Sequence, residues 1–350
     1  MNTKKGFKLS SQGRIASAVS LALVLPMLSV TALADNIRPV GQTSVSKVGE
    51  VDVINIANPN AKGLSHNQYK DFNVSKSGAV LNNSLQSGQS QLAGQLDANS
   101  NLKGTASIIL NEVVSKNPSL LLGQQEVFGM AADYVLANPN GITGKDIGFI
   151  NTNRASLVVG TPTIAEDRLA GFSVGDRTSK TLALSGDING NQRLDLLAPK
   201  VDINGNIKAS EAINVISGRN NIDYDTLDVS SHERSQPHVT LDGQILGSMN
   251  SGRIRLHNTD TDATQTLQGQ FNAAQDFDAA ADTLKVSDSQ ISANNVSLAG
   301  NKQLSIGGEV QTARIDLDKN QQKLEDNVTL TNSGYKEVES FKGSSITGEN

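Results

Sequence analysis

The chain of 350 residues has no cysteine, no tryptophan and few aromatic residues, which make up 3% of it. Without cysteine there can be no disulfide bridge and no thiolate-bound metal. With 30 Lys and Arg against 35 Asp and Glu, the chain also lacks the basic excess that is typical of a nucleic-acid-binding protein. Few rings argue against a compact enzyme core and favour a thin, repetitive core of Val, Ile, Leu and Ala.

The first 34 residues have the three parts of a secretory signal peptide. A basic start is followed by an apolar stretch over residues 15–30 and by small residues that end at Ala34; the basic residues are Lys4, Lys5, Lys8 and Arg14. The apolar stretch is shorter than the roughly 20 residues of a membrane-spanning helix and contains Pro26. We therefore favour cleavage between Ala34 and Asp35 over a membrane anchor, which leaves an acidic chain of net charge −9, with 26 basic and 35 acidic residues.

From residue 51 onward, short runs in which apolar and polar residues alternate are separated by Asn, Gly, Asp and Ser. Alternation is typical of half-buried strands, and only residues 111–115 and 271–282 show a weak helical pattern. Asp187-Ile-Asn-Gly190 and Asp202-Ile-Asn-Gly205 resemble one unit used twice, 15 residues apart. Such self-similarity favours a right-handed parallel β-helix over a β-sandwich, because each coil of a solenoid repeats the one before it. Coils of roughly 20 residues would give about 13 of them between residues 51 and 310.

Several longer segments together carry a family resemblance. They are Val53–Ala61, Gly63–Val74, Leu81–Asn83, Ile109–Val113, Asn117–Ser119, Glu126–Gly129, Tyr134–Thr143, Gly148–Thr152, Leu194–Ala198 and Ile213–Gly218. In this order they resemble the secretion domain of two-partner-secreted exoproteins, the filamentous-haemagglutinin-like family, over residues 35–230. The chain departs from the family at two points, since Asn99-Ser100-Asn101-Leu102 stands where Asn-Pro-Asn-Leu is common and residues 144–147 contain no cysteine.

The resemblance implies an all-β fold, a right-handed parallel β-helix with N-terminal capping and extra-helical β-hairpins. We divide the chain into a signal peptide (1–34), a two-partner secretion domain with β-helix (35–290), further β-helix coils (291–332) and a frayed or truncated tail (333–350). The resemblance also implies a mechanism, in which a dedicated outer-membrane transporter recognises the domain through periplasmic modules and passes the unfolded chain through its β-barrel. Coil-by-coil folding outside the cell agrees with this mechanism, because each coil contacts only its neighbours.

Two asparagine-containing motifs are the candidate transporter-recognition and turn residues. The first comprises Asn99, Asn101 and Leu102, and the second comprises Asn138, Pro139, Asn140, Gly141 and Ile142. In the second motif, proline presets φ for a type I turn and glycine closes the turn. Two interpretations stay open, namely that the turn shapes a corner of the β-helix or that it contacts the transporter directly.

Signals for catalysis or metal binding are weak. His66 is predicted in a turn, and His232 and His238 do not have the spacing of a helical metal pair. Gly171–Gly175 matches the letters Gly-x-Ser-x-Gly, but a polar stretch follows where a nucleophile elbow needs a helix. Eight aspartates that alternate along strands are predicted on solvated outer faces: Asp187, Asp195, Asp223, Asp225, Asp260, Asp262, Asp316 and Asp318. We expect no catalytic residue, no metal and no cofactor.

The sequence therefore predicts a secreted exoprotein with an adhesin- or haemagglutinin-like role in cell adhesion. It would leave a Gram-negative bacterium through the periplasm and outer membrane and end in the medium or on the cell surface. The expected partners are the transporter and a host-cell or bacterial surface receptor, with no nucleic acid, and the chain is expected to be a monomer. Two alternatives stay open: a truncated remnant of a contact-dependent growth inhibition toxin or large adhesin, and an extracellular β-helix enzyme that degrades polysaccharide. The enzyme would need carboxylates and basic residues together in one groove.

Overall fold

The computed structural model describes residues 36–175, 180–231, 240–317, 322–324, 329–332 and 345–348. The predicted signal peptide, its cleavage site at Ala34 and Asp35, both His232 and His238, and Asp318 lie outside the described residues. Every regular element within these ranges is a β-strand. Over the same residues, no helix has the length and apolar character needed to cross a membrane.

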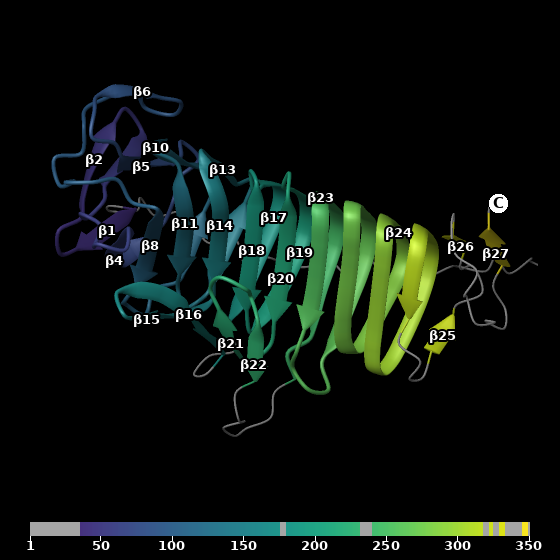
Figure 1. The fold of residues 1–350 in the computed structure, drawn as a ribbon. Helices are drawn as coiled ribbons and strands as arrows, with labels where there is room; N and C mark the ends of the chain where they lie inside the picture. Colours follow the sequence, from purple (N-terminus) through teal and green to yellow (C-terminus); the bar gives the residue numbers. More distant parts are fainter. Residues whose placement is uncertain are drawn as a thin grey trace, which may run out of the picture. The chain divides into compact units, whose positions relative to one another are not determined.

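Twenty-one of the strands belong to one continuous sheet (Figure 1). The strands of its first half are β1 (Ile37–Val40), β2 (Ser44–Val48), β3 (Val51–Asn55), β4 (Leu64–Phe72), β5 (Ala79–Asn83), β8 (Ile108–Val113), β9 (Ser119–Leu121), β10 (Gln124–Gly129), β11 (Ala132–Ala137), β12 (Ile142–Lys145), β13 (Gly148–Ile150) and β14 (Thr152–Val158). The others are β17 (Thr181–Asn189), β18 (Arg193–Ala198), β19 (Lys200–Lys208), β20 (Ala212–Ser217), β23 (Gly243–Asn258), β24 (Thr264–Leu317), β25 (Gln322–Leu324), β26 (Thr329–Asn332) and β27 (Ser345–Gly348).

The sheet curls round an axis because strands far apart in sequence pair in parallel. One series of neighbours is β4, β8, β11, β14, β18, β20 and β23, and a second is β9, β12, β17, β19 and β23. A third is β3, β5, β10 and β13. At the N-terminal end, β1 pairs antiparallel with β4 and β2 pairs antiparallel with β3. The predicted parallel β-helix with N-terminal capping is therefore confirmed.

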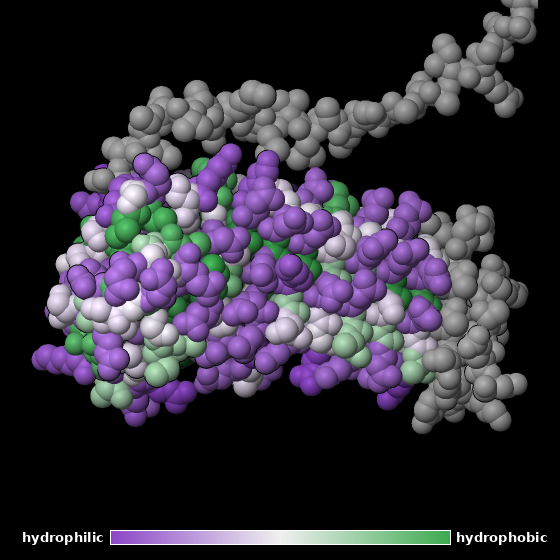
Figure 2. Space-filling model, turned by 90° about the horizontal axis from the view of Figure 1, so that it is seen from above, coloured by the Kyte–Doolittle hydropathy of each residue, from purple (hydrophilic) through white to green (hydrophobic). Residues whose placement is uncertain are grey.

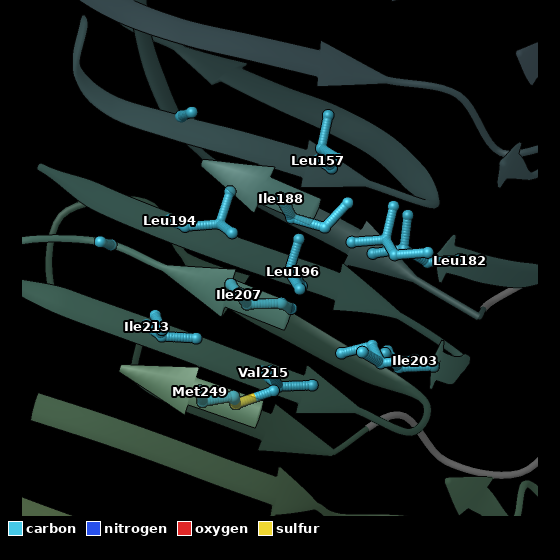
Figure 3. Packing of buried hydrophobic residues seen from close by; sticks show 14 of the residues in the cluster. Leu157, Leu182, Ile188, Leu194, Leu196, Ile203, Ile207, Ile213, Val215 and Met249 are labelled. Atoms are coloured by element: carbon cyan, nitrogen blue, oxygen red, sulfur yellow. The ribbon is translucent and has the colours of Figure 1, made fainter. Parts of the chain in front are cut away.

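Aliphatic side chains of successive coils stack on one another inside the sheet (Figure 3). Register pairing places Leu182 opposite Val201 and Leu194 opposite Ile213, and all four side chains are buried. Burying one such side chain stabilises the fold by about 1.5–3 kcal/mol. The polar residues that alternate with them point outward, and hydrophilic side chains accordingly cover much of the face shown in Figure 2.

The coils are 19 residues long where nothing interrupts them. Thr181 pairs with Lys200 and Arg193 pairs with Ala212. The predicted 15-residue repeat is wrong, because Asp187 lies opposite Asn206 and Asp202 lies opposite Ala183. The chain also forms fewer coils than predicted, since excursions lengthen some register steps to 39–46 residues, as between Arg154 and Arg193 and between Ala79 and Gln125.

A column of glycines runs along one corner of the coil stack. Gly186, Gly205, Gly247 and Gly269 are successive register partners. The φ angle of Gly247 is 125°, and a Cβ atom on this residue would lie 2.1 Å from the carbonyl oxygen of Gly205. The corner therefore requires glycine both for its backbone angle and for the close approach of neighbouring coils.

Six strands lie outside the coil stack. β6 (Gly88–Ser90) and β7 (Gly94–Leu96) form an antiparallel hairpin. β15 (Gly160–Ala165), β16 (Arg168–Val174), β21 (Asn220–Asp223) and β22 (Val229–Ser231) form a four-stranded antiparallel sheet, here called the extra-helical sheet. A second apolar core joins this sheet to outward-facing residues of the coils; its members include Val158, Leu197, Ile216, Phe172 and Ile222. These elements confirm the predicted extra-helical hairpins.

Three local predictions need correction. Residues 111–113 lie in β8 and residues 271–282 lie in β24, so neither weak helical pattern forms a helix. His66 lies in β4 rather than in a turn, and its Nε2 is 2.8 Å from Oε2 of Glu112 on the next coil. The hydrogen bond from His66 lowers the pKa of Glu112 below its ordinary value, although burial opposes this shift. Cross-coil pairing overrides local helical preference at these positions.

Candidate functional site

The second asparagine motif forms a turn between β11 and β12, here called the second asparagine turn (residues 138–142). The Asn138 side chain is fully buried, and its Nδ2 donates to the carbonyl oxygen of Asn117 at 3.0 Å and to Oγ of Ser119 at 2.9 Å. Its Oδ1 accepts the backbone N–H of Asn140 at 2.9 Å. Asn138 therefore spends its amide on closing its own turn and on tying that turn to the preceding coil.

The backbone of the second asparagine turn is tied on both sides. The Asn138 N–H donates to the carbonyl oxygen of Val158 on β14, and the Gly141 carbonyl accepts the N–H of Ser119. Gly141 has a φ of 110°, which favours glycine, and the following Ile142 is buried in the main core. Asn140 is half-buried and donates from Nδ2 to the carbonyl oxygen of Ser115 at 3.0 Å. Pro139 is half-buried, between two side chains that point into the fold.

The first asparagine motif, here called the first asparagine turn (residues 99–102), repeats this geometry. Asn99 is 2% exposed, and its Nδ2 donates to the carbonyl oxygens of Ile56 and Asn82 at 3.0 and 2.9 Å. Its Oδ1 accepts the Asn101 N–H at 3.0 Å, and its carbonyl accepts the Leu102 N–H at 3.1 Å. Leu102 packs in the main core. Ser100 is exposed, so the serine in the usual proline position leaves the turn intact.

Both asparagine turns thus have one design. The first asparagine is buried, its oxygen closes the turn, and its amide reaches the backbone of neighbouring coils. Leaving such a buried partner unsatisfied costs about 1–3 kcal/mol per group. What the turns do chemically is to fix where two loops of the coil stack run. Their surfaces expose parts of Ser100, Pro139 and Asn140 rather than the buried amides.

A third asparagine pair escaped the sequence analysis as a separate site. Asn60 closes its own loop by accepting the N–H groups of Lys62 and Leu64 at 2.9 and 3.1 Å, and its Nδ2 donates to the Asp167 carbonyl at 2.7 Å. Asp167 lies at the tip between β15 and β16 and has a φ of 61°. Its letters, Asn58-Pro59-Asn60, match those of the second motif, and this signal could have singled it out.

The predicted solvated positions of two aspartates are wrong. Asp195 is fully buried and forms an ion pair with Arg154, and Asp260 is 5% exposed and lies 2.7 Å from Nη1 of Arg219. A polar position on a strand looks solvated in sequence, but here an excursion of the chain covers it. The structure agrees with the prediction for Asp187 and Asp316, which are exposed.

One shallow groove, of about 270 Å³, brings carboxylates and a base together. Its polar lining comes from three successive coils and comprises Asp276, Asp278, Asn295, Ser297, Arg314 and Asp316. Asn295 donates to Asp276 at 2.8 Å, and Nε2 of His257 lies 2.7 Å from Asp278. Burial pushes the pKa of Asp278 upward, but the His257 contact outweighs it and the pKa is lowered. A glycosidic general acid needs the opposite shift, so this groove gives no support to the polysaccharide-degrading alternative.

Other candidate chemistry is not assembled by the fold. Residues 171–174 of the Gly-x-Ser-x-Gly stretch lie in β16, in the middle of the extra-helical sheet. Among the described residues, no group of three or more His, Asp or Glu side chains is placed to hold a metal ion. The predicted recognition residues fall into the two turns described above, and the two turns are built into different coils.

Comparisons with known proteins agree with this architecture. A family model described as the TPS secretion domain matches residues 31–282. A hemolysin of Proteus mirabilis is 44% identical over 351 residues, which cover 98% of this chain and 21% of that protein. Toxin CdiA of Yersinia pestis is 36% identical over 299 residues, which cover 81% of this chain and 9% of that protein. The chain thus spans about a fifth or less of the curated relatives it matches.

A solved structure shares the fold. The crystal structure of the filamentous hemagglutinin secretion domain matches this chain with a TM-score of 0.65 and 28% sequence identity. The match covers 84% of this chain and 99% of that one, so it includes the coil stack and reaches beyond the two asparagine turns.

Proposed function

Because the chain belongs to the TPS secretion-domain family of two-partner secretion exoproteins, we propose that residues 35–290 form the part through which an outer-membrane transporter recognises and exports it. The observation that carries this proposal is the family match over residues 31–282 on a coil stack like that of the filamentous hemagglutinin secretion domain. The transporter's periplasmic modules meet the chain before it crosses the outer membrane.

The N-terminal residues supply the first step of this route. Residues 1–34 carry the chain into the periplasm and are removed between Ala34 and Asp35, since they have the pattern of a cleaved signal peptide. Residues 291–332 continue the coils, and residues 333–350 form a tail outside the secretion domain. N-terminal sequencing of the exported chain tests the first boundary, because the proposal requires Asp35 as the new first residue.

We propose that the two asparagine turns act through the fold, by holding the coils at their corners, rather than by side-chain contact with the transporter. Burial of Asn99 and Asn138 and their bonds to neighbouring coils support this role. Contact by the exposed atoms of Pro139 and Asn140 is compatible with it, because a fixed turn also fixes the surface that it presents.

The experiment that tests the proposed function is export with and without the cognate transporter. Cells that express the chain with the transporter should release it into the medium or display it on the surface. Cells without the transporter should hold the processed chain in the periplasm. Equal release from both strains would contradict the proposal.

The activity of the exported protein is a separate proposal. An adhesin- or haemagglutinin-like role in cell adhesion, through a host-cell or bacterial surface receptor, is supported by the likeness to the filamentous hemagglutinin domain. A toxin role has a specific observation in its favour, since the hemolysin of Proteus mirabilis is 44% identical and Toxin CdiA is 36% identical. Lysis of red cells by the exported chain, compared with its binding to them, separates the two.

A further inference from the structure

A buried cation joins the coil stack to the extra-helical sheet. Arg154 lies on β14 with its side chain 7% exposed, and its Nε donates to the carboxylate of Asp195 on β18, which is fully buried. On its other side, Nη1 donates to the carbonyl oxygen of Tyr224 at 2.6 Å, and the guanidinium carbon lies 4.2 Å from the Tyr224 ring centre. Tyr224 directly follows β21, so coils and extra-helical sheet hold one side chain between them.

Both ends of this contact continue into further coils. Asp195 also accepts Nδ2 of Asn214 on β20 at 2.7 Å and Oγ of Ser156 at 3.2 Å. The Tyr224 hydroxyl donates to Oδ2 of Asp133 on β11 at 2.7 Å. A single chain of contacts therefore links β11, the extra-helical segment, β14, β18 and β20, in the order Asp133, Tyr224, Arg154, Asp195 and Asn214.

The position of Arg154 is costly without its cover. A buried charge destabilises a fold strongly unless it is paired and its donors are satisfied. Burial lowers the pKa of Arg154, but the charge of Asp195 outweighs this and keeps the pKa above its ordinary value, so the side chain stays a cation. Its Nη2 is buried and has no hydrogen-bond partner among the described residues. The Tyr224 ring and carbonyl thus replace water on the face that Asp195 does not satisfy.

We propose that Arg154 is the positioning residue through which the extra-helical sheet stabilises the coil stack, so that β14 and β18 reach full stability only when Tyr224 covers the guanidinium. Tyr224 follows Arg154 by 70 residues in the chain. For its consequence in export, the inference rests on the proposed function. A chain that crosses the membrane unfolded cannot complete these coils until residue 224 has emerged, which opposes premature folding of the first half of the domain.

Hydrogen exchange of the purified full-length chain, measured by mass spectrometry, tests this. In Tyr224→Ala, amides of β14 and β18 should exchange at least about tenfold faster than in the parent chain, because opening of these coils becomes easier. Leu169→Ala is the matched control, since Leu169 is buried in the same apolar core but lies on β16 without a contact to Arg154 given by the structure. It should accelerate exchange mainly in the extra-helical sheet. Tyr224→Phe, which keeps the ring and loses only the bond to Asp133, should preserve most protection.

A rescue experiment decides between the buried charge and general loosening. Adding Arg154→Met and Asp195→Asn to Tyr224→Ala removes both charges, and exchange in β14 and β18 should return to within about threefold of the parent. If Tyr224→Ala does not fold while Leu169→Ala does, recovery of a folded chain in this triple variant is the expected result. Acceleration confined to β15, β16, β21 and β22, or failure of the rescue, would overturn the proposal. No transporter is present in this assay, so its failure is distinct from a failure of the proposed export function.

Discussion

The glycine column predicts that a single methyl group destabilises the coil stack strongly. In Gly247→Ala, the new Cβ would lie 2.1 Å from the Gly205 carbonyl oxygen, on a residue with a φ of 125°. The backbone angle alone costs about 1–3 kcal/mol, and separating the two coils weakens inter-coil hydrogen bonds worth about 0.5–1.5 kcal/mol each. We expect a loss of roughly 3–5 kcal/mol in the free energy of unfolding.

Two other glycines separate these effects. Gly41 has a φ of 82° and no atom near its Cβ position, so Gly41→Ala should cost only the backbone term, about 1–2 kcal/mol. Gly104 has neither a left-handed angle nor a neighbour there, and Gly104→Ala should be neutral or stabilise by about 0.4–1 kcal/mol. Urea unfolding followed by circular dichroism ranks the three midpoints. The reasoning is refuted if Gly247→Ala unfolds at the same urea concentration as Gly41→Ala.

Three further predictions concern the asparagine turns and acid stability. Asn138→Ala should lower the free energy of unfolding by about 2–4 kcal/mol, because it strands two buried partners, and should lower export in parallel, whereas the exposed Asn153→Ala should change neither; unfolding curves and secretion assays together check this, and normal stability with lost export would favour direct contact instead. Ser100→Pro should raise the unfolding midpoint, by about 0.4–1 kcal/mol, since proline suits the second position of this turn; a lower midpoint would show that the backbone angle there is incompatible. The pKa of Glu112 is lowered in the folded chain, so its contribution is present above its unfolded value of 4.5 and is lost as the pH falls below that value; the parent should therefore lose stability between pH 5 and 3 more steeply than Glu112→Gln, and parallel pH profiles would contradict this.

The fold was predictable because the coil stack shows itself in local patterns. Apolar and polar residues alternate in β17 and β19, and this alternation is what a sheet with one buried face requires. The asparagine turns were predictable as turns, since Asn138 to Gly141 combine residues that favour a tight turn. Their burial was not, because it depends on Asn117 and Ser119 of another coil.

The register was not predictable from the repeated letters. The two Asp-Ile-Asn-Gly units begin 15 residues apart, whereas the coil step is 19 residues. A better signal was present, since Asp187 and Asn206 are 19 residues apart and so are Asp195 and Asn214, and in both pairs the later asparagine donates to the earlier aspartate. A carboxylate opposite an amide is favoured where two stacked carboxylates would repel.

The buried network around Arg154 could not have been found from sequence. Asp195 looks like any outward polar residue of an alternating strand, and its burial depends on a segment that returns after β21. Asp260 is hidden from sequence for a related reason, because Arg219 lies just beyond β20. Excursions that leave the coil stack and cover it again carry no local periodicity.

Paired cysteines in the exported chain test the central claim, a stack of 19-residue coils, most directly, because the native sequence has none to interfere. Asp187 and Asn206 are exposed register partners on parallel strands, at a spacing that a disulfide can bridge. The account predicts that a chain with Asp187→Cys and Asn206→Cys forms the bridge under mild oxidation, whereas one with Asp187→Cys and Asp202→Cys does not. Bridging of the 15-residue pair, with none in the 19-residue pair, would contradict the coil register and the fold built on it.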